Sequence, residues 1–308
     1  MKNIDLHMHT QYSDGEYNVE TVLRECENAE LSVISITDHD EVGAYKEIEE
    51  NPKIRKIFSG KIIKGTELSF NKDGRLFDLL GYGIDYKKMQ KLLEERMDDN
   101  SRKQMQAILL EEWKQVCIKK GIKFDNKIKT SKGTKSEAFN LLFEDISDFK
   151  KYPENEKFIE YISKQNIANF YKKCFSNPNS DFFVNEARFF PSLKEVIDMI
   201  HKSGGKAFLA HSFAYGLEDT IGFINYAIQE GIDGIEQYYS TFTNEQENII
   251  KELANSNSLL ISGGTDFHGP NVKPGINVGV GKGNMNIPES IIWNWLPNSR
   301  RKRLGNNF

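Results

Sequence analysis

The 308-residue sequence is poor in cysteine and has no long run of apolar residues. Its three cysteines, Cys26, Cys117 and Cys174, are far apart and odd in number, which predicts reduced thiols rather than a disulfide framework or a zinc finger. No segment approaches the roughly 18 consecutive apolar residues that a membrane-spanning helix needs. These absences argue against a disulfide-stapled secreted domain and against a membrane protein.

An excess of charge of one sign is also absent. The chain has 41 Lys and Arg against 45 Asp and Glu, a formal net charge of −4, so no global field attracts nucleic acid and no binding to DNA grooves is expected. The first residues, MKNIDLHMHT, lack the charged and then apolar plan of a signal peptide. We therefore expect a cytoplasmic protein.

Short apolar runs alternate with helical spacing in two parts of the chain. In the first part we expect strands at 2–6, 33–36 and 61–64, helices at 18–30 and 42–50, and a hairpin of 67–70 and 76–80 around the turn NKDG. In the second part, helices are expected at 192–202, 219–230 and 244–256, and strands at 206–210, 234–236 and 258–262. Such alternation predicts an α/β fold with a parallel sheet or a barrel. The two parts, 1–86 and 187–290, can belong to one barrel.

Between these parts the sequence changes character. Residues 87–186 are dense in Lys and Glu, have amphipathic spacing over 97–120, and show no clear strands. We expect a mainly helical insertion that covers the functional site. Residues 291–308 end in the basic string NSRRKRLGNNF, which is expected to be a solvated tail.

Five of the six histidines fall at or just after an apolar run, each with a carboxylate nearby in sequence. His7 and His9 are two residues apart on a strand, so their imidazoles point to the same face. In a parallel barrel, side chains at the carboxyl ends of the strands meet over one mouth. The candidates at these ends are His7, His9, Asp14, His39, Glu67, His211, Asp266 and His268. Together they predict a metal site.

Each of these residues also has an ordinary explanation when taken alone. Asp14 in YSDG suits a turn, and Glu67 suits a surface position. The order of the whole set, strand by strand, favours the metal site. His201 lies outside the set on the helical pattern LKEVIDMIHK, where its position near a helix C-terminus is favourable to the helix dipole.

The strings HMHTQYSDG, ITDHD, GTELS, LLGYGID, AHS and GGTDFHG resemble, in order and spacing, the motifs of the PHP family. This is the polymerase and histidinol phosphatase superfamily of metal-dependent phosphoesterases. The similarity covers roughly residues 1–86 and 187–285. It implies a distorted seven-stranded β/α barrel with two to three divalent ions, Mn, Zn or Fe. With its insertion between the LLGYGID and AHS motifs, the chain most resembles the branch of the family that hydrolyses nucleotide 3′,5′-bisphosphates or short 5′-phosphorylated RNA.

The resemblance also implies how the ligands are shared. One ion would be held by His7, His9, Glu67 and Asp266, a second by Asp14, His39 and His268, and a third by Glu67 with His211. Two positions depart from the family pattern. Asp78 stands where the family often has histidine, and Ser212 where it often has proline. Asp78 either holds the third ion with a preference for manganese or iron, or leaves that ion weakly bound.

A count of local charges gives a separate argument. Three divalent ions bring +6 and Asp14, Glu67, Asp78 and Asp266 bring −4, which leaves +2, whereas two ions leave zero. A site of zero charge would bind a phosphate dianion poorly without basic side chains. Arg188 and Lys64 are candidates for that help, although side chains of this kind are usually only solvated.

The expected reaction is hydrolysis of a phosphate monoester by metal-activated hydroxide. Asp38 and Asp40 flank His39 and are candidates to orient an imidazole N–H or move a proton; alternatively they belong to a surface loop with Asp40 as a helix N-cap. The expected substrate is a small phosphorylated metabolite, a nucleotide or short RNA. The alternatives are a histidinol-phosphate phosphatase and an inactive, metal-stabilised binding module.

Overall fold

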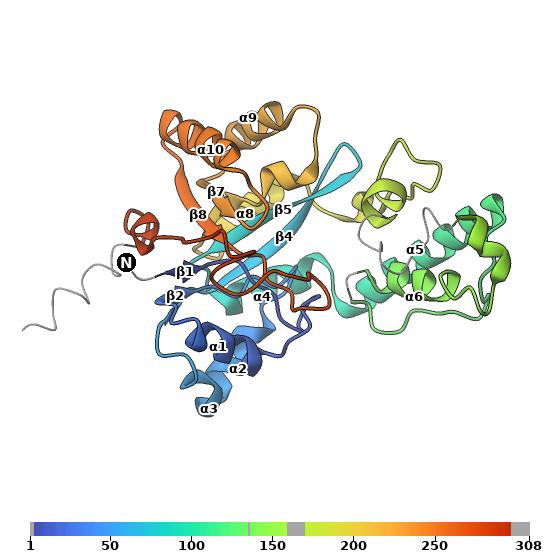
Figure 1. The fold of residues 1–308 in the computed structure, drawn as a ribbon, viewed down its shortest axis with the longest axis horizontal. Helices are drawn as coiled ribbons and strands as arrows, with labels where there is room; N and C mark the ends of the chain where they lie inside the picture. The colour runs from blue at the N-terminus through green and yellow to red at the C-terminus, as the bar shows by residue number, and fades with distance from the viewer. Residues whose placement is uncertain (1–2, 135, 159–169, 297–308) are drawn as a thin grey trace, which may run out of the picture. The chain divides into compact units, whose positions relative to one another are not determined.

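The computed structural model describes residues 3–134, 136–158 and 170–296. The chain divides into two compact units (Figure 1). Unit 1 comprises Met1–Ser69, Phe77–Leu92 and Leu193–Phe308, and unit 2 comprises Phe70–Leu76 and Leu93–Ser192. Each unit therefore contains segments that are distant in the sequence.

The first sheet of unit 1 has three short parallel strands, β1 (Ile4–Asp5), β2 (Val33–Ile34) and β3 (Lys61–Ile62), in the order β1-β2-β3. Helix α1 (Val19–Asn28) connects β1 to β2, and α2 (Gly43–Glu50) and α3 (Pro52–Arg55) connect β2 to β3. Helix α1 begins where the Asn18 side chain accepts a hydrogen bond from the Thr21 amide. It buries Val19, Val22, Leu23 and Cys26, whose spacing forms one apolar face.

The second sheet has the order β4-β5-β6-β7-β8. Strands β4 (Gly65–Lys72) and β5 (Arg75–Tyr82) form the expected hairpin, and Asp73 and Gly74 between them both have positive φ, which suits a tight hairpin turn. Strand β6 (Lys206–Leu209) is antiparallel to β5, whereas β7 (Gly234–Tyr239) and β8 (Leu260–Gly264) continue in parallel. Helices α8 (Leu193–Lys202), α9 (Thr220–Glu230) and α10 (Asn244–Ser256) each precede one of these parallel strands.

The α/β class is confirmed, whereas the closed barrel is not. Within the described residues the strands form a three-stranded and a five-stranded sheet. Single parallel bridges join the sheets, Met8 with Phe267 and His39 with Glu67. Figure 1 shows helices α1, α2 and α3 on one side of these strands and α9 and α10 on the other. The carboxyl ends of β1, β2 and β8 thus lie next to one another.

Unit 2 is mainly helical, as the sequence predicts for the insertion. Helix α4 (Tyr86–Arg96) begins within unit 1, which extends to Leu92, and is followed by α5 (Asp99–Lys120) of unit 2. Helix α6 (Glu137–Ile146) packs on α5. Shorter helical turns span Pro153–Phe158, Tyr171–Phe175 and Glu186–Phe189. The core is aromatic: the rings of Trp113 and Phe175 stack 5.1 Å apart, and Phe139 lies against both.

Residues 291–296, expected to begin a solvated tail, instead pack against the rest of unit 1. The predicted tail begins at 291, but Ile292 is fully buried and Trp295 packs on Tyr82 and Phe208 in the core of unit 1. Burial of these large apolar side chains offsets the cost of ordering the segment. The basic residues of the tail lie outside the described range. Within that range, the helices are too short or too polar to cross a lipid bilayer.

Candidate metal centre

The nine predicted ligands all belong to unit 1, and eight of them form three overlapping groups. In each group one ligand atom per residue lies within 4.8 Å of every other. The groups are His7, His9, Glu67 and Asp266; His9, Asp14, His39 and His268; and His39, Glu67 and Asp78. Ligand atoms bound to one ion at about 2.0–2.3 Å lie at separations of this order, so the side chains fit divalent cations.

The two histidines after β1 converge as their spacing predicts. Their ring centroids are 5.3 Å apart, and both side chains are fully buried. His7 Nε2 lies 3.0 Å from Glu67 Oε2, and His9 Nε2 lies 3.1 Å from the same oxygen. Burial acts to lower the pKa of His9, but the carboxylates of Asp266 and Glu67 outweigh it and raise the pKa to about 9. The cluster is therefore strongly attractive to positive charge.

Glu67 lies at the centre of the cluster. Its Oε2 contacts His7 and His9 and lies 3.5 Å from His39 Nδ1, while its Oε1 lies 2.9 Å from His211 Nε2. Burial acts to raise the pKa of this carboxyl, but the surrounding imidazoles, His7 foremost, hold it well below its ordinary value. Glu67 is thus an ionised carboxylate shared by two of the three groups.

The second group includes the most exposed ligand. His9 and His268 stack with ring centroids 3.9 Å apart, and His268 Nε2 lies 3.2 Å from Asp14 Oδ1. The Asp14 side chain is 44% exposed, whereas His9 and His268 are buried. The loop YSDG therefore does more than turn the chain: it places a carboxylate at the open side of the cluster.

The third group differs from the set implied by the family. Asp78 Oδ1 lies 3.9 Å from His39 Nδ1, so Asp78 and Glu67 are grouped with His39 rather than with His211. Asp78 also accepts a hydrogen bond of 2.9 Å from the Ser69 hydroxyl, and its backbone amide donates to the Tyr215 hydroxyl at 2.7 Å. These partners fix the carboxylate at the edge of the cluster.

Asp38 and Asp40 accept hydrogen bonds from backbone amides and hydroxyl groups, and their proposed action on an imidazole stays a prediction. Asp38 is buried and accepts bonds of 2.7 Å from the Thr10 amide, the Thr10 hydroxyl and the Ser13 hydroxyl, so it fixes the loop that carries Asp14. Asp40 accepts from the Ser69 amide at 3.3 Å. It is also not the N-cap of α2, because that position is Val42.

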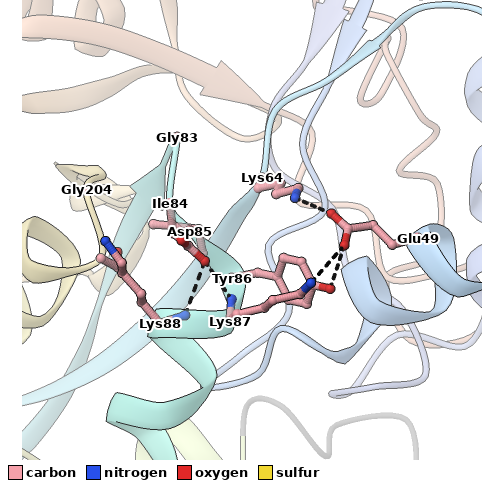
Figure 2. Close-up of a pocket in the computed structure, with 10 residues that line it drawn as sticks. Glu49, Lys64, Gly83, Ile84, Asp85, Tyr86, Lys87, Lys88 and Gly204 are labelled. Carbon is pink, nitrogen blue, oxygen red and sulfur yellow. Dashed lines mark hydrogen bonds and ion pairs between the residues drawn. The ribbon is translucent and has the colours of Figure 1, made fainter.

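The two predicted basic residues are engaged elsewhere. Arg188 belongs to unit 2, where its guanidinium donates to Glu112 at 2.8 Å and to the Asn185 carbonyl at 2.7 Å. Lys64 lines a separate pocket of about 570 Å³ in unit 1 that contains none of the predicted ligands. Figure 2 shows Lys64 directed at Glu49, whose carboxylate also accepts a hydrogen bond from the Tyr86 hydroxyl. His201 likewise lies outside the cluster and pairs with Asp233 at 2.7 Å.

Sequence reasoning missed three residues that contact the predicted ligands. Glu236 on β7 lies 2.9 Å from His7 Nδ1 and accepts the backbone N–H of His211 at 2.8 Å. The Tyr239 hydroxyl donates to Asp266 Oδ2 at 2.7 Å, and the Lys273 ammonium contacts the same oxygen. Glu236 could have been noticed in the sequence, because it is a charged residue in a short strand expected to be buried. Lys273 follows the last ligand by only five residues, but nothing in a loop sequence indicates its direction.

Backbone conformation distinguishes several of these positions. Asp40, His211 and Asp266 have φ of 50°, 25° and 57°, backbone conformations that residues other than glycine seldom adopt. Such conformations persist where surrounding contacts hold them and are concentrated at functional sites. At His211 and Asp266, the chain leaves a strand in this conformation with the side chain in contact with other predicted ligands.

Comparison with known proteins shows the family to which the chain belongs. The family model described as PHP domain matches residues 5–263. A 5′-3′ exoribonuclease of Haemophilus influenzae is 25% identical over 300 residues, covering 96% of this chain and 98% of the relative.

Two solved structures are similar in fold. One is an amidohydrolase from Chromobacterium violaceum with bound sulfate and no metal, at 20% identity and a TM-score of 0.65. The other is a protein from Bifidobacterium adolescentis named as a metal-dependent phosphoesterase, at 19% identity and a TM-score of 0.63. Each comparison covers 96% of both chains.

Proposed function

Because this chain belongs to the PHP domain family, a family of hydrolases, we propose that it is a phosphoesterase acting on nucleotide 3′,5′-bisphosphates or on short 5′-phosphorylated RNA. Metal-dependent phosphoester hydrolysis is the general activity. The observation that carries the site is the convergence of His7, His9, Glu67 and Asp266 within one buried group. The nucleotide branch is supported by the near end-to-end match to a relative named 5′-3′ exoribonuclease.

The donor set suits divalent ions of borderline hardness. Imidazole nitrogens and carboxylate oxygens are ligands for Zn, Mn and Fe, and we propose that two to three such ions bind across the three groups. When bound, ions of this kind lower the pKa of water and neutralise charge on phosphoryl oxygens. The side chains described next would hold those ions and position the ligands.

The protein's own residues orient the ligands. Glu236 lies 2.9 Å from Nδ1 of His7, and Nε2 of the same ring lies 3.0 Å from Glu67 and 3.4 Å from Asp266. Glu236 would thus hold the ring so that Nε2 faces an ion bound beside those carboxylates. Asp38 holds the loop of Asp14 through Thr10 and Ser13. The 44% exposure of the Asp14 side chain leaves one side of the cluster accessible to solvent, which a closed structural metal site would lack.

The remaining expectations are proposals about architecture. We propose that the two sheets form one distorted barrel, closed through the bridges Met8 with Phe267 and His39 with Glu67. We also propose that the insertion helps to select the substrate and that the protein acts in the cytoplasm. The first proposal is supported by the resemblance of the motifs and the helical character of unit 2. The second is supported by the three free, buried cysteines, which suit a reducing compartment.

The test combines metal analysis with a substrate panel. The protein as isolated is expected to contain Mn, Zn or Fe and, with Mn²⁺, to release phosphate or nucleotides from 3′,5′-bisphosphates or 5′-phosphorylated RNA. The panel includes histidinol phosphate, so turnover confined to that compound would move the assignment to that activity. Since RNA is a phosphodiester, monoester and diester products are measured separately.

Loss of one central ligand provides the matched variant. His9→Ala is expected to abolish turnover and to reduce the metal content, because His9 belongs to two of the three groups. His201→Ala, at a solvent-exposed ion pair, serves as the control and is expected to behave like wild type. Wild-type turnover by His9→Ala after chelation and remetallation would contradict the proposed site.

A further inference from the structure

Lys273 lies on the outer side of a predicted metal ligand. Asp266 Oδ1 faces the imidazoles of His7, His9 and His268 at 3.3–3.4 Å. Its other oxygen, Oδ2, accepts from the Tyr239 hydroxyl at 2.7 Å and contacts the Lys273 ammonium. The ammonium is therefore next to the cluster without occupying the position that faces the imidazoles.

The loop of Lys273 is fixed beside the loop of Asp14. The Lys273 amide donates to the Gly269 carbonyl at 3.0 Å. The Asn271 side chain and amide donate to the two oxygens of Glu16 at 2.6 and 3.0 Å, and the Glu16 amide donates to the His268 carbonyl at 2.8 Å. These bonds join the two loops at one edge of the centre.

That edge is also where solvent reaches the cluster. The side chains of Asp14 and Lys273 are 44% and 35% exposed, whereas His7, His9 and Glu67 are fully buried. A substrate anion approaching the centre from solvent therefore meets these two loops first. Lys273 supplies a positive charge there, on a flexible stem that can turn from Asp266 toward an incoming oxyanion.

The charge balance of the centre indicates why a cation at this edge would help to bind a phosphate dianion. With two divalent ions, the carboxylates of Asp14, Glu67, Asp78 and Asp266 bring the sum to zero. Glu236, 2.9 Å from His7, lowers the sum to −1, and Lys273 returns it to zero. Resting on the proposed phosphoesterase function, we propose that Lys273 is the side chain that binds a phosphate oxygen of the substrate at the mouth of the metal centre. Lys273 contacts a predicted metal ligand, whereas Lys64 and Arg188 pair with Glu49 and Glu112, which lie outside the predicted set.

Phosphate binding and metal content test this assignment directly. Lys273→Met in the Mn²⁺-loaded protein is expected to weaken binding of inorganic phosphate and to raise KM by roughly 10- to 100-fold, the size expected for a lost charge-assisted hydrogen bond. Metal content is expected to stay at the wild-type value. Lys273→Arg is expected to recover most of the affinity, and Lys282→Met, at an exposed lysine of the same C-terminal region, is the control.

Two results would overturn the assignment. Wild-type phosphate affinity and KM in Lys273→Met would show that the ammonium does not bind substrate. A fall in metal content that accounts for the whole loss would mean that Lys273 only positions Asp266. Phosphate binding that depends on Lys273 in a protein without turnover would instead refute the proposed hydrolysis and keep the binding role.

Discussion

The interiors of the two units differ: unit 2 is packed largely from aromatic rings, whereas unit 1 also buries a cluster of carboxylates and imidazoles. Unit 2 encloses an apolar core in which Trp113, Phe139 and Phe175 pack ring against ring. Unit 1 also has apolar layers, but it buries charged and polar groups such as Glu67 and Asp266 between them. The aromatic core gains free energy from burial itself, whereas buried carboxylates are costly unless positive charge is placed against them.

The difference separates stability from function within one chain. All nine predicted ligands belong to unit 1, so a defect in the core of unit 2 is expected to change stability first. A defect among the polar contacts of the ligand cluster in unit 1 is expected to change metal binding first, whereas a polar contact of unit 1 away from the cluster should have little effect on it. Three substitutions test this division, in order of decreasing effect.

The largest effect is expected in the aromatic core. Phe139→Ala removes a ring that is 97% buried and contacts five other aromatic side chains of that core, and it should reduce the stability of unit 2 by about 3–5 kcal/mol. Hydrogen exchange of α5 and α6 measures the loss. Ile118→Ala, at a side chain with 56% exposure on α5, is the control and should cost little. A parallel loss of metal would show that the two interiors depend on each other.

An intermediate effect is expected at Glu236. Glu236→Gln keeps the shape of the side chain but removes the charge that holds His7 Nδ1, and it should weaken metal binding by about 10- to 100-fold. Metal titration measures the change, with Glu252→Gln on the surface of α10 as the control. If metal affinity is unchanged and only the melting temperature falls, Glu236 is part of the core rather than of the metal centre.

The smallest effect is expected at Asp233, a polar group of unit 1 away from the cluster. Burial acts to raise the pKa of its carboxyl, but hydrogen bonds from the Ala207 amide and His201 outweigh it, so the folded pKa lies below the unfolded one. Its stabilisation is therefore present above the unfolded pKa, about 3.9, and is lost as pH falls through the folded pKa.

Asp233→Asn is accordingly expected to lose about 1 kcal/mol or less at pH 7, and the gap from wild type should shrink in acid. Urea unfolding at several pH values measures it. Turnover and metal content should match wild type, and a gap that widens in acid would reverse the sign argued here.

The sequence predicts on which strand face or strand end a side chain lies better than it predicts which other side chains it contacts. His7 and His9 converge because strand geometry alone places alternate side chains on one face. The strand ends that carry His39 and Asp266 follow from short apolar runs, although metal ligation itself stays a prediction. By contrast, the grouping of Asp78 with His39 depends on sheet register, and Asp38 bonds to Thr10 because of a loop conformation.

Long-range partners were inaccessible for the same reason. Glu236 contacts His7 across 229 positions of sequence, and nothing in the string GIE indicates which imidazole it faces. Arg188 was predicted from its charge, and in the structure it belongs to unit 2, where its guanidinium pairs with Glu112. Its role at the site stays a prediction. Local periodicity determines where a side chain points, whereas the fold determines what it meets.

The position of Glu67 has a consequence for how the centre fills. One carboxylate serves two ligand groups and touches four imidazoles, so successive cations do not meet independent sites. The first cation to arrive changes both the charge and the freedom of the group that the next one needs. By thermodynamic reciprocity, the factor by which the first alters the affinity for the second equals the factor in the other direction. Occupancy therefore rises along a cooperative or anticooperative curve, and the concentration of free metal sets how many ions are bound at once.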